Sequence, residues 1–338
     1  MRELLTATSV TKEYITGGGL LSHKKMAALQ DFSLKLQSDQ PAVLAVAGES
    51  GSGKTTLARL LLGIAQPTSG SVTYKGRDLR AMSRSERMEF RREVQAVFQD
   101  PFEVYNPFYK VDHVLTTPLA KFGLADSKAD ATRQIHAALE QVGLRPEETL
   151  GRYPHQVSGG QRQRIMVARA LLLRPRILLA DEPVSMVDAS LRATILESLL
   201  KLHQEHNISL LYITHDLTTA YQLCEEIIIL YRGNVVESGS VDLVIKEPQH
   251  PYTQLLVNSI PLPDPNRRWG EDDTSATQAA TPSSVGTERG CKFAGRCPHV
   301  MDACLRAQPP LLPTDPRRSV ACYLYEDHQQ EHATNHAN

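Results

Sequence analysis

The apolar positions of this chain gather in short continuous runs. Such runs are typical of strands that are buried on both faces, as in a parallel sheet. Runs of strand length occur at residues 42–47, 177–180, 210–213 and 227–230. The pattern also predicts two strands near the N-terminus, at residues 4–14 and 30–37.

Helix-like stretches alternate with these runs, at residues 56–62, 129–142, 162–173, 191–203 and 217–223. This alternation predicts an α/β fold with a central, mostly parallel sheet. The N-terminal strands are expected to be antiparallel. The helical stretch at about 100–160 is expected to form an inserted subdomain.

The composition of the chain changes after residue 260. Residues 261–290 are rich in Pro, Ser, Thr and Gly, which predicts a linker. A small cysteine-containing appendage is expected at 291–325, followed by a polar tail at 326–338. Residues 1–260 would then form the main domain.

Charge and hydropathy exclude some classes of protein. Lys and Arg number 37 against 38 Asp and Glu, so the net charge is −1. This balance disfavours a protein that wraps nucleic acid through bulk positive charge. No apolar run reaches the roughly 18 residues that span a bilayer, and the N-terminus lacks the features of a secretory signal. We therefore expect a cytosolic protein whose membrane role depends on a partner.

A phosphate-binding loop is predicted at residues 48–55, which read Gly-Glu-Ser-Gly-Ser-Gly-Lys-Thr. The segment fits G-x-x-x-x-G-K-[ST] between a predicted strand and a predicted helix, the context this motif requires. Glycines let backbone N–H groups surround phosphate oxygens, Lys54 reaches the β- and γ-phosphates, and the Thr55 hydroxyl reaches Mg²⁺. The expected nucleotide-binding residues are Gly48, Glu49, Ser50, Gly51, Ser52, Gly53, Lys54, Thr55 and Thr56.

Two further motifs indicate nucleotide hydrolysis and a second phosphate-binding surface. Asp181 and Glu182 end an apolar run, where Asp181 can serve Mg²⁺ and Glu182 can polarise an attacking water. Ser158, Gly159, Gly160 and Gln161 precede a predicted helix and form a second anion-binding surface. Two phosphate-binding surfaces in one chain indicate that two copies sandwich each nucleotide.

With these motifs, residues 1 to about 260 resemble the ATP-binding subunit of an ABC transporter. The resemblance implies ATP hydrolysis, and it implies roles for several more residues. Tyr14 would stack on adenine, Gln99 would sense Mg²⁺ and the transmembrane partner, and Asp188 would link the two sites. His215 would hold the γ-phosphate and the attacking water, while Ser158, Gly159 and Gly160 would close on the nucleotide of the facing subunit.

Further segments resemble the oligopeptide/dipeptide importer subfamily: Tyr153-Pro154-His155-Gln156, Arg162-Gln163-Arg164 and His250-Pro251-Tyr252-Thr253. This implies two transmembrane permease subunits, a second and distinct ATP-binding subunit, and indirectly an extracytoplasmic solute-binding protein. The chain would lie peripherally on the cytoplasmic face of the inner membrane. Importers of oligosaccharides or nickel complexes remain alternatives within the subfamily. A soluble ABC-type ATPase that acts on nucleic acid or ribosomes is the alternative of another class, and a metal-sensing regulatory ATPase is a third.

Four cysteines lie in the last 50 residues: Cys291, Cys297, Cys304 and Cys322. Disulfides are disfavoured in a chain without a secretory signal, so the cluster indicates a metal site. The spacing C-x5-C-x6-C-x17-C lacks the close pair usual for structural zinc. Some members of the resembled subfamily carry a [4Fe-4S] cluster on such a segment. We therefore expect a cluster with a structural role, with Zn²⁺ or simple reduced thiols as alternatives.

Overall fold

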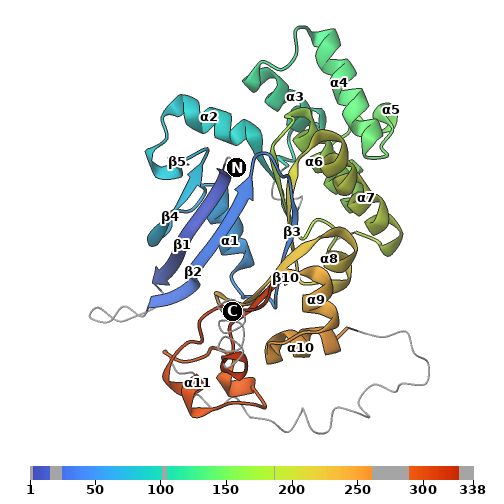
Figure 1. Cartoon of the computed structure of the whole chain (residues 1–338). Coiled ribbons are helices and arrows are strands. Elements are labelled where there is room, and N and C mark those ends of the chain that lie inside the picture. The colour runs from blue at the N-terminus through green and yellow to red at the C-terminus, as the bar shows by residue number, and fades with distance from the viewer. Residues whose placement is uncertain (1–2, 16–24, 101–104, 186, 261–288, 327–338) are drawn as a thin grey trace, which may run out of the picture. The chain divides into compact units, whose positions relative to one another are not determined.

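The structure of this chain is a computed structural model that describes residues 3–15, 25–100, 105–185, 187–260 and 289–326 (Figure 1). The chain divides into two compact units. The first unit contains residues 1–10, 33–44 and 55–213, and the second contains residues 11–32, 45–54 and 214–338. Almost all of the predicted linker and the polar tail lie outside the described residues, and the predicted domain boundary near residue 260 stays a prediction.

Three parallel strands form the centre of the first unit: β6 (Val94–Val97), β7 (Ile177–Asp181) and β8 (Ser209–Thr214). Every residue of these strands is buried, as expected for parallel strands that are covered on both faces. The N–H of Leu210 donates to the carbonyl of Ala42 over 2.8 Å, just before β3 (Val43–Ala47). The runs predicted as buried parallel strands at 177–180 and 210–213 are therefore confirmed.

A second sheet contains the N-terminal strands in the order β2–β1–β4–β5. Its members are β1 (Glu3–Ile15), β2 (Lys25–Gln37), β4 (Ser69–Tyr74) and β5 (Arg77–Asp78). The two predicted N-terminal strands are present, but β2 begins five residues before the predicted position 30. The two strands β4 and β5 pair antiparallel.

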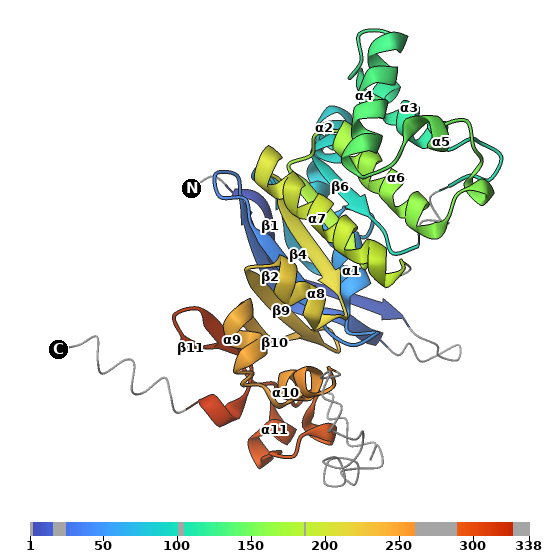
Figure 2. The ribbon, with the colours of Figure 1, turned by 90° about the vertical axis from the view of Figure 1, so that its right-hand side faces the viewer.

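Three helices of the first unit, α3, α4 and α7, contact α6 (Figure 2). The helices α3, α4 and α5 lie within the stretch that was predicted to be helical. The bounds are α1 (Lys54–Leu61), α2 (Arg84–Glu93), α3 (Asp112–Phe122), α4 (Lys128–Gln141), α5 (Pro146–Thr149), α6 (Gly159–Leu172) and α7 (Ala189–His206). The sequence pattern did not predict α2.

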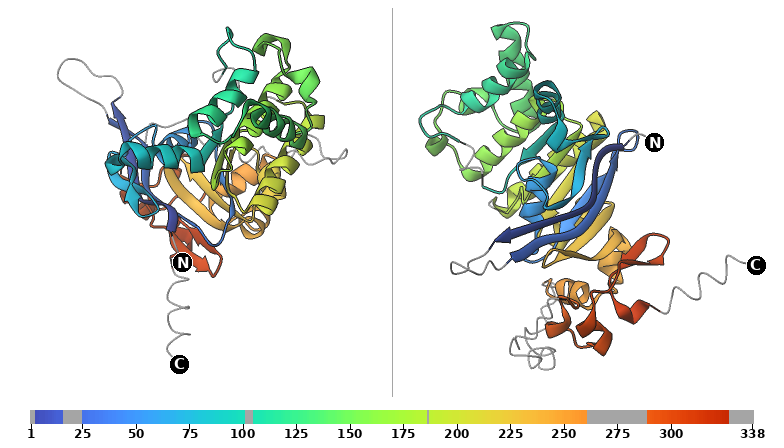
Figure 3. Two further views of the ribbon diagram at one scale, coloured as in Figure 1. Left: turned by 90° about the horizontal axis from the view of Figure 1, so that it is seen from above. Right: turned by 90° about the vertical axis from the view of Figure 1, so that its left-hand side faces the viewer.

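The second unit is built on the antiparallel pair β9 (Glu226–Tyr231) and β10 (Asn234–Ser240), preceded by α8 (Leu217–Leu223). After α9 (Val241–Lys246) and α10 (Pro251–Asn258), the chain returns as α11 (Asp302–Arg306), β11 (Leu312–Asp315) and β12 (Arg318–Val320). The strand β12 pairs antiparallel with β10, with Ser319 opposite Ser238. The C-terminal segment is drawn in red in Figure 3. The cysteine segment is therefore followed by a strand that pairs with β10, and the predicted bounds of the small C-terminal appendage, residues 291–325, stay a prediction.

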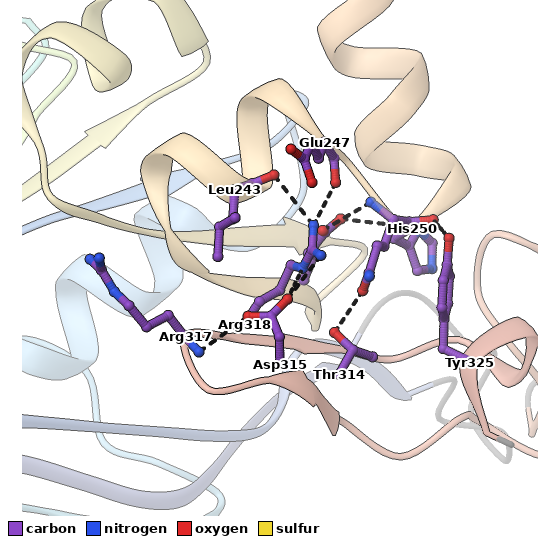
Figure 4. Close-up of polar contacts among 10 residues, drawn as sticks. Leu243, Glu247, His250, Thr314, Asp315, Arg317, Arg318 and Tyr325 are labelled. Atoms are coloured by element: carbon purple, nitrogen blue, oxygen red, sulfur yellow. Dashed lines mark hydrogen bonds and ion pairs between the residues drawn. The ribbon is translucent and has the colours of Figure 1, made fainter. Parts of the chain in front are cut away.

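A buried polar cluster holds this C-terminal return in place (Figure 4). The Arg318 side chain is 7% exposed, pairs with Asp315 over 2.8 Å and donates to the carbonyl of Glu247 over 2.6 Å. Glu237, which is fully buried, accepts the backbone N–H groups of Gln249 and His250 over 3.0 Å each. Buried charges are stable only when paired and hydrogen-bonded, so these contacts fix the register of β12 on β10.

His250 makes the stability of the same cluster depend on pH. Its imidazole is 1% exposed, and Nδ1 accepts the N–H of Tyr252 over 3.0 Å at the start of α10. Burial lowers the pKa of His250 from 6.5 to about 4. A proton on Nδ1 would break this bond and place a charge in the interior, so the folded protein excludes it.

We expect wild-type stability to fall as the pH drops from 7 to 5, because the unfolded chain binds a proton at His250 that the folded chain rejects. The loss amounts to about 2 kcal/mol over this range. His250→Asn should lack this component, since Asn keeps an acceptor at the helix start but does not titrate. Urea unfolding of both proteins at pH 7 and pH 5 measures the difference. The neighbouring Glu237 titrates in both proteins and so cancels, and an equal pH dependence would contradict the assignment.

Candidate functional site

The loop at 48–54 has the backbone that the sequence predicted for phosphate binding. It joins the buried strand β3 to α1. Gly48 has φ +153°, and a Cβ there would lie 2.2 Å from the carbonyl oxygen of Leu230. Gly53 has φ +110°, and its Cβ would lie 2.4 Å from the carbonyl oxygen of Ala28. Side chains are therefore excluded at both positions by conformation and by space.

Polar groups of this loop converge on its interior. Lys54, which is 7% exposed, donates through Nζ to the carbonyl oxygens of Gly48 and Glu49 over 2.6 and 2.9 Å. The Ser52 hydroxyl is buried and has no hydrogen-bond partner among the described residues. A buried hydroxyl requires a partner, and a phosphate oxygen is an acceptor of the right chemistry. The loop therefore fits a nucleotide phosphate group.

The two predicted carboxylates lie at the end of β7 in the first unit. Asp181 is its last residue and is 8% exposed. Glu182 follows with φ +45°, a left-handed conformation that is unfavourable for a side chain, and its N–H donates to the carbonyl of Ile213 over 2.8 Å. Gln99 follows β6, which is parallel to β7, so Gln99 and Asp181 lie at the same edge of the sheet. Non-glycine strain of this kind is concentrated at functional positions.

The second predicted anion site is a well-capped helix start. The Ser158 hydroxyl accepts the N–H of Gln161 over 3.2 Å, while the Gln161 side chain accepts the N–H of Ser158 over 2.9 Å. This reciprocal cap starts α6 at Gly159, three residues before the predicted position. Ser158 is exposed, and its hydroxyl hydrogen remains a donor. The start of α6 thus offers donors to an external anion.

The remaining predicted residues occupy exposed positions at the ends of elements. Tyr14 lies near the end of β1 with 36% of its surface exposed, and the Lys12 ammonium lies 5.1 Å from its ring centroid. Asp188 precedes α7 without a side-chain cap bond. His215 follows β8 and is exposed, so it is not a core histidine. Gly48–Lys54, Tyr14 and His215 belong to the second unit, and the other predicted nucleotide-site residues belong to the first.

Two residues that touch the phosphate loop were not predicted to do so. The Tyr252 hydroxyl accepts the N–H of Glu49 over 2.8 Å, and the Arg296 guanidinium pairs with the Glu49 carboxylate. In the sequence, the segment that contains Tyr252 indicates only a resemblance to the importer subfamily. Arg296 is 247 positions from Glu49, and no local pattern in the sequence signals the contact.

The four C-terminal cysteines are free thiols in one neighbourhood. The N–H of Cys291 donates to the carbonyl of Cys304 over 2.8 Å. Burial raises the pKa of Cys291 and of Cys297, and it raises the pKa of Cys322 to about 11, with smaller contributions from the neighbouring thiols.

Nevertheless, no three His, Cys, Asp or Glu side chains in the described part of the chain are arranged to hold a metal ion. The described residues therefore contain no preformed site for the predicted metal. A structural zinc site requires four sulfurs placed tetrahedrally around the ion, each at about 2.3 Å from it. The segment also has a core that the sequence did not reveal: Phe293 is 2% exposed, and Val320 is fully buried.

Comparisons with known proteins identify the family of the chain. Residues 29–185 match the family model "ABC transporter", and residues 236–304 match "Oligopeptide/dipeptide transporter, C-terminal region". The chain is 37% identical over 329 residues to "Di/tripeptide transport ATP-binding protein DppF" of Pseudomonas aeruginosa (strain UCBPP-PA14), covering 96% of this chain and 99% of that protein.

Solved structures show the same fold. The dimeric ATP-binding cassette MJ0796, solved in a post-hydrolysis state with ADP and phosphate, is 28% identical with a TM-score of 0.63, covering 70% of this chain and 99% of the other. Among the described residues, no helix has the length and apolarity needed to cross a bilayer. This chain belongs to the ABC transporter family, as an ATP-hydrolysing subunit that carries the oligopeptide/dipeptide transporter C-terminal region.

Proposed function

We propose that this chain powers the import of oligopeptides or dipeptides through transmembrane permease partners. The match of residues 236–304 to the oligopeptide/dipeptide transporter C-terminal region carries the proposal. A relative named for di- and tripeptide transport aligns over 96% of the chain, so the likeness extends beyond the ATP-binding core.

In this proposal the phosphate loop binds the nucleotide, and the carboxylates bind Mg²⁺ and activate water. The N–H groups of residues 48–54 bind the phosphates, and Lys54 exchanges its present carbonyl partners for β- and γ-phosphate oxygens. Thr55, Gln99 and Asp181 would hold Mg²⁺, which neutralises phosphate charge when bound. Glu182 polarises the attacking water and accepts its proton.

The remaining residues position the nucleotide. Tyr14 stacks on adenine, and His215 holds the γ-phosphate and the attacking water. Ser158, Gly159, Gly160 and Gln161 act on the nucleotide of a facing ATP-binding subunit, because the exposed start of α6 offers donors to an external anion. Asp188 links the two sites.

The match to the oligopeptide/dipeptide transporter C-terminal region also supports a proposal for the partners. We propose a complex of two permease subunits, this chain and a second, distinct ATP-binding subunit, supplied by an extracytoplasmic solute-binding protein. The chain would lie peripherally on the cytoplasmic face of the inner membrane. Affinity purification from detergent-solubilised membranes, with uptake assays in cells that lack the chain, tests the proposal. Loss of labelled di- and tripeptide uptake supports it, whereas loss of oligosaccharide or nickel uptake alone would contradict it.

Glu182→Gln should bind Mg-ATP normally and lose at least about a hundredfold in turnover, because it keeps the shape of the side chain but removes the base. Glu197→Gln, on the exposed face of α7, is the matched control. Steady-state ATPase rates and nucleotide binding are measured on the assembled complex. Wild-type turnover in Glu182→Gln would remove this residue from the base role.

Lys54→Ala should weaken nucleotide binding itself, since Lys54 contacts phosphates already in the ground state. The exposed Lys201, also on α7, gives the control variant Lys201→Ala. Titration with a fluorescent ATP analogue measures both. If Lys54→Ala bound the analogue as tightly as the control variant does, residues 48–54 would not be the phosphate site.

We also propose that Cys291, Cys297, Cys304 and Cys322 ligate a [4Fe-4S] cluster of structural role. Soft thiolates select iron–sulfur clusters or Zn²⁺, and the wide spacing of the four cysteines lacks the close pair usual for structural zinc. Protein purified without oxygen should be brown and hold about four irons per chain. About one zinc per chain would replace the cluster with a zinc site, and absence of both metals would leave four reduced thiols.

A further inference from the structure

Glu49 of the phosphate loop is held from two directions by the C-terminal part of the chain. We propose that Arg296 is a positioning residue for this loop, and that through it the cysteine segment sets the affinity for nucleotide. The inference rests on the proposed role of residues 48–54 in binding phosphate.

The contact between Arg296 and Glu49 has the geometry of a strong ion pair. Nη1 and Nη2 of Arg296 donate to the two carboxylate oxygens of Glu49 over 3.0 and 3.1 Å. Such paired bonds fix the orientation of both planar groups. The hydrogen bond to Glu49 is also the main cause that raises the pKa of the Arg296 guanidinium.

Arg296 is itself held in place by aromatic rings. Its guanidinium lies 5.6 Å from the ring centroid of Phe293 and 5.9 Å from that of Tyr231. These rings contact each other and Tyr252, with centroids 4.4–5.6 Å apart. Phe293 and Tyr252 are buried, so the guanidinium packs against aromatic rings that are themselves held in place. The position of Arg296 thus depends on the fold of the cysteine segment.

Glu49 connects Arg296 and its aromatic neighbours to the phosphate loop. Its carbonyl accepts Lys54 Nζ over 2.9 Å and the N–H of Ser52 over 3.1 Å, while its own N–H donates to Tyr252. A shift of Glu49 would therefore change the backbone shape of the loop whose N–H groups bind phosphate. Loss of Arg296 would also leave a carboxylate without its cation beside the phosphates, which repel it.

Coupling of this kind acts in both directions. If Arg296 holds the loop in its phosphate-binding shape, bound nucleotide must stabilise the turn that carries Arg296. That turn is short: the N–H of Ala294 donates to Cys291 over 3.1 Å, and the N–H of Arg296 donates to Phe293 over 2.9 Å. The exchange of these amide hydrogens therefore reports on the coupling.

The test compares Arg296→Gln with Arg306→Gln in the full-length chain. Arg306 lies in the same segment and bonds only to the carbonyl of Asp302, among the contacts found in the described residues. We expect Arg296→Gln to weaken binding of a fluorescent ATP analogue about three- to fivefold, which is about 0.7–1 kcal/mol. Arg296→Lys should recover part of the loss, because it keeps the charge but not the paired geometry. The difference should shrink at about 1 M salt, because both side chains are partly exposed.

Two further measurements separate positioning from simple damage to the fold. In a Glu49→Gln background, Arg296→Gln should have little further effect on affinity, because its partner charge is already gone. Saturating nucleotide should slow hydrogen exchange in a peptide that covers residues 291–306 of the wild type, but not of Arg296→Gln. Equal nucleotide affinity of Arg296→Gln and wild type, or equal exchange with and without nucleotide, would overturn the inference.

Lys54→Ala distinguishes this result from a failure of the proposed function. If the wild type binds the analogue, Lys54→Ala does not, and Arg296→Gln binds like the wild type, only the coupling is wrong. If Lys54→Ala binds like the wild type, the phosphate site itself is misassigned and the inference fails with it.

Discussion

The constraint on which this structure depends is the close approach of backbone to backbone at the phosphate loop. The carbonyl oxygens of Leu230 and Ala28 occupy the space that side chains at Gly48 and Gly53 would need. The loop is therefore shaped by β2 and β9 as much as by its own sequence, and the N–H of Gly233 donates to the carbonyl of Ser52 over 2.8 Å. A loop packed in this way presents its N–H groups in a fixed arrangement before any ligand arrives, which reduces the entropic cost of binding.

The same reasoning extends to the C-terminal region. Pairing of β12 with β10 and the buried contacts of Arg318 connect residues 289–326 to the strands behind the loop. Tyr252 and Phe293 then place hydrogen-bond and ring contacts between this region and the loop. The C-terminal part thus belongs to the second unit and supplies contacts to the phosphate loop.

Much of this could be predicted from the sequence, because the decisive signals are local. Continuous apolar runs located β7 and β8, and the spacing of glycines and lysine located the loop. The sequence did not reveal α2, where Phe90 is the buried residue, since a helix that is polar on almost every face has no apolar period. It also missed the partners of β12 and Arg296, because strand pairing and ion pairs between distant segments leave no pattern in neighbouring residues.

The backbone conformation of Glu182 limits which substitutions can stabilise the protein without loss of its carboxylate. A left-handed backbone at a residue with a side chain costs about 1–3 kcal/mol, a cost that glycine would largely avoid. Selection for thermal stability alone would therefore favour loss of this carboxylate. The strained conformation is thus a point where stability is in conflict with the catalytic role proposed for Glu182.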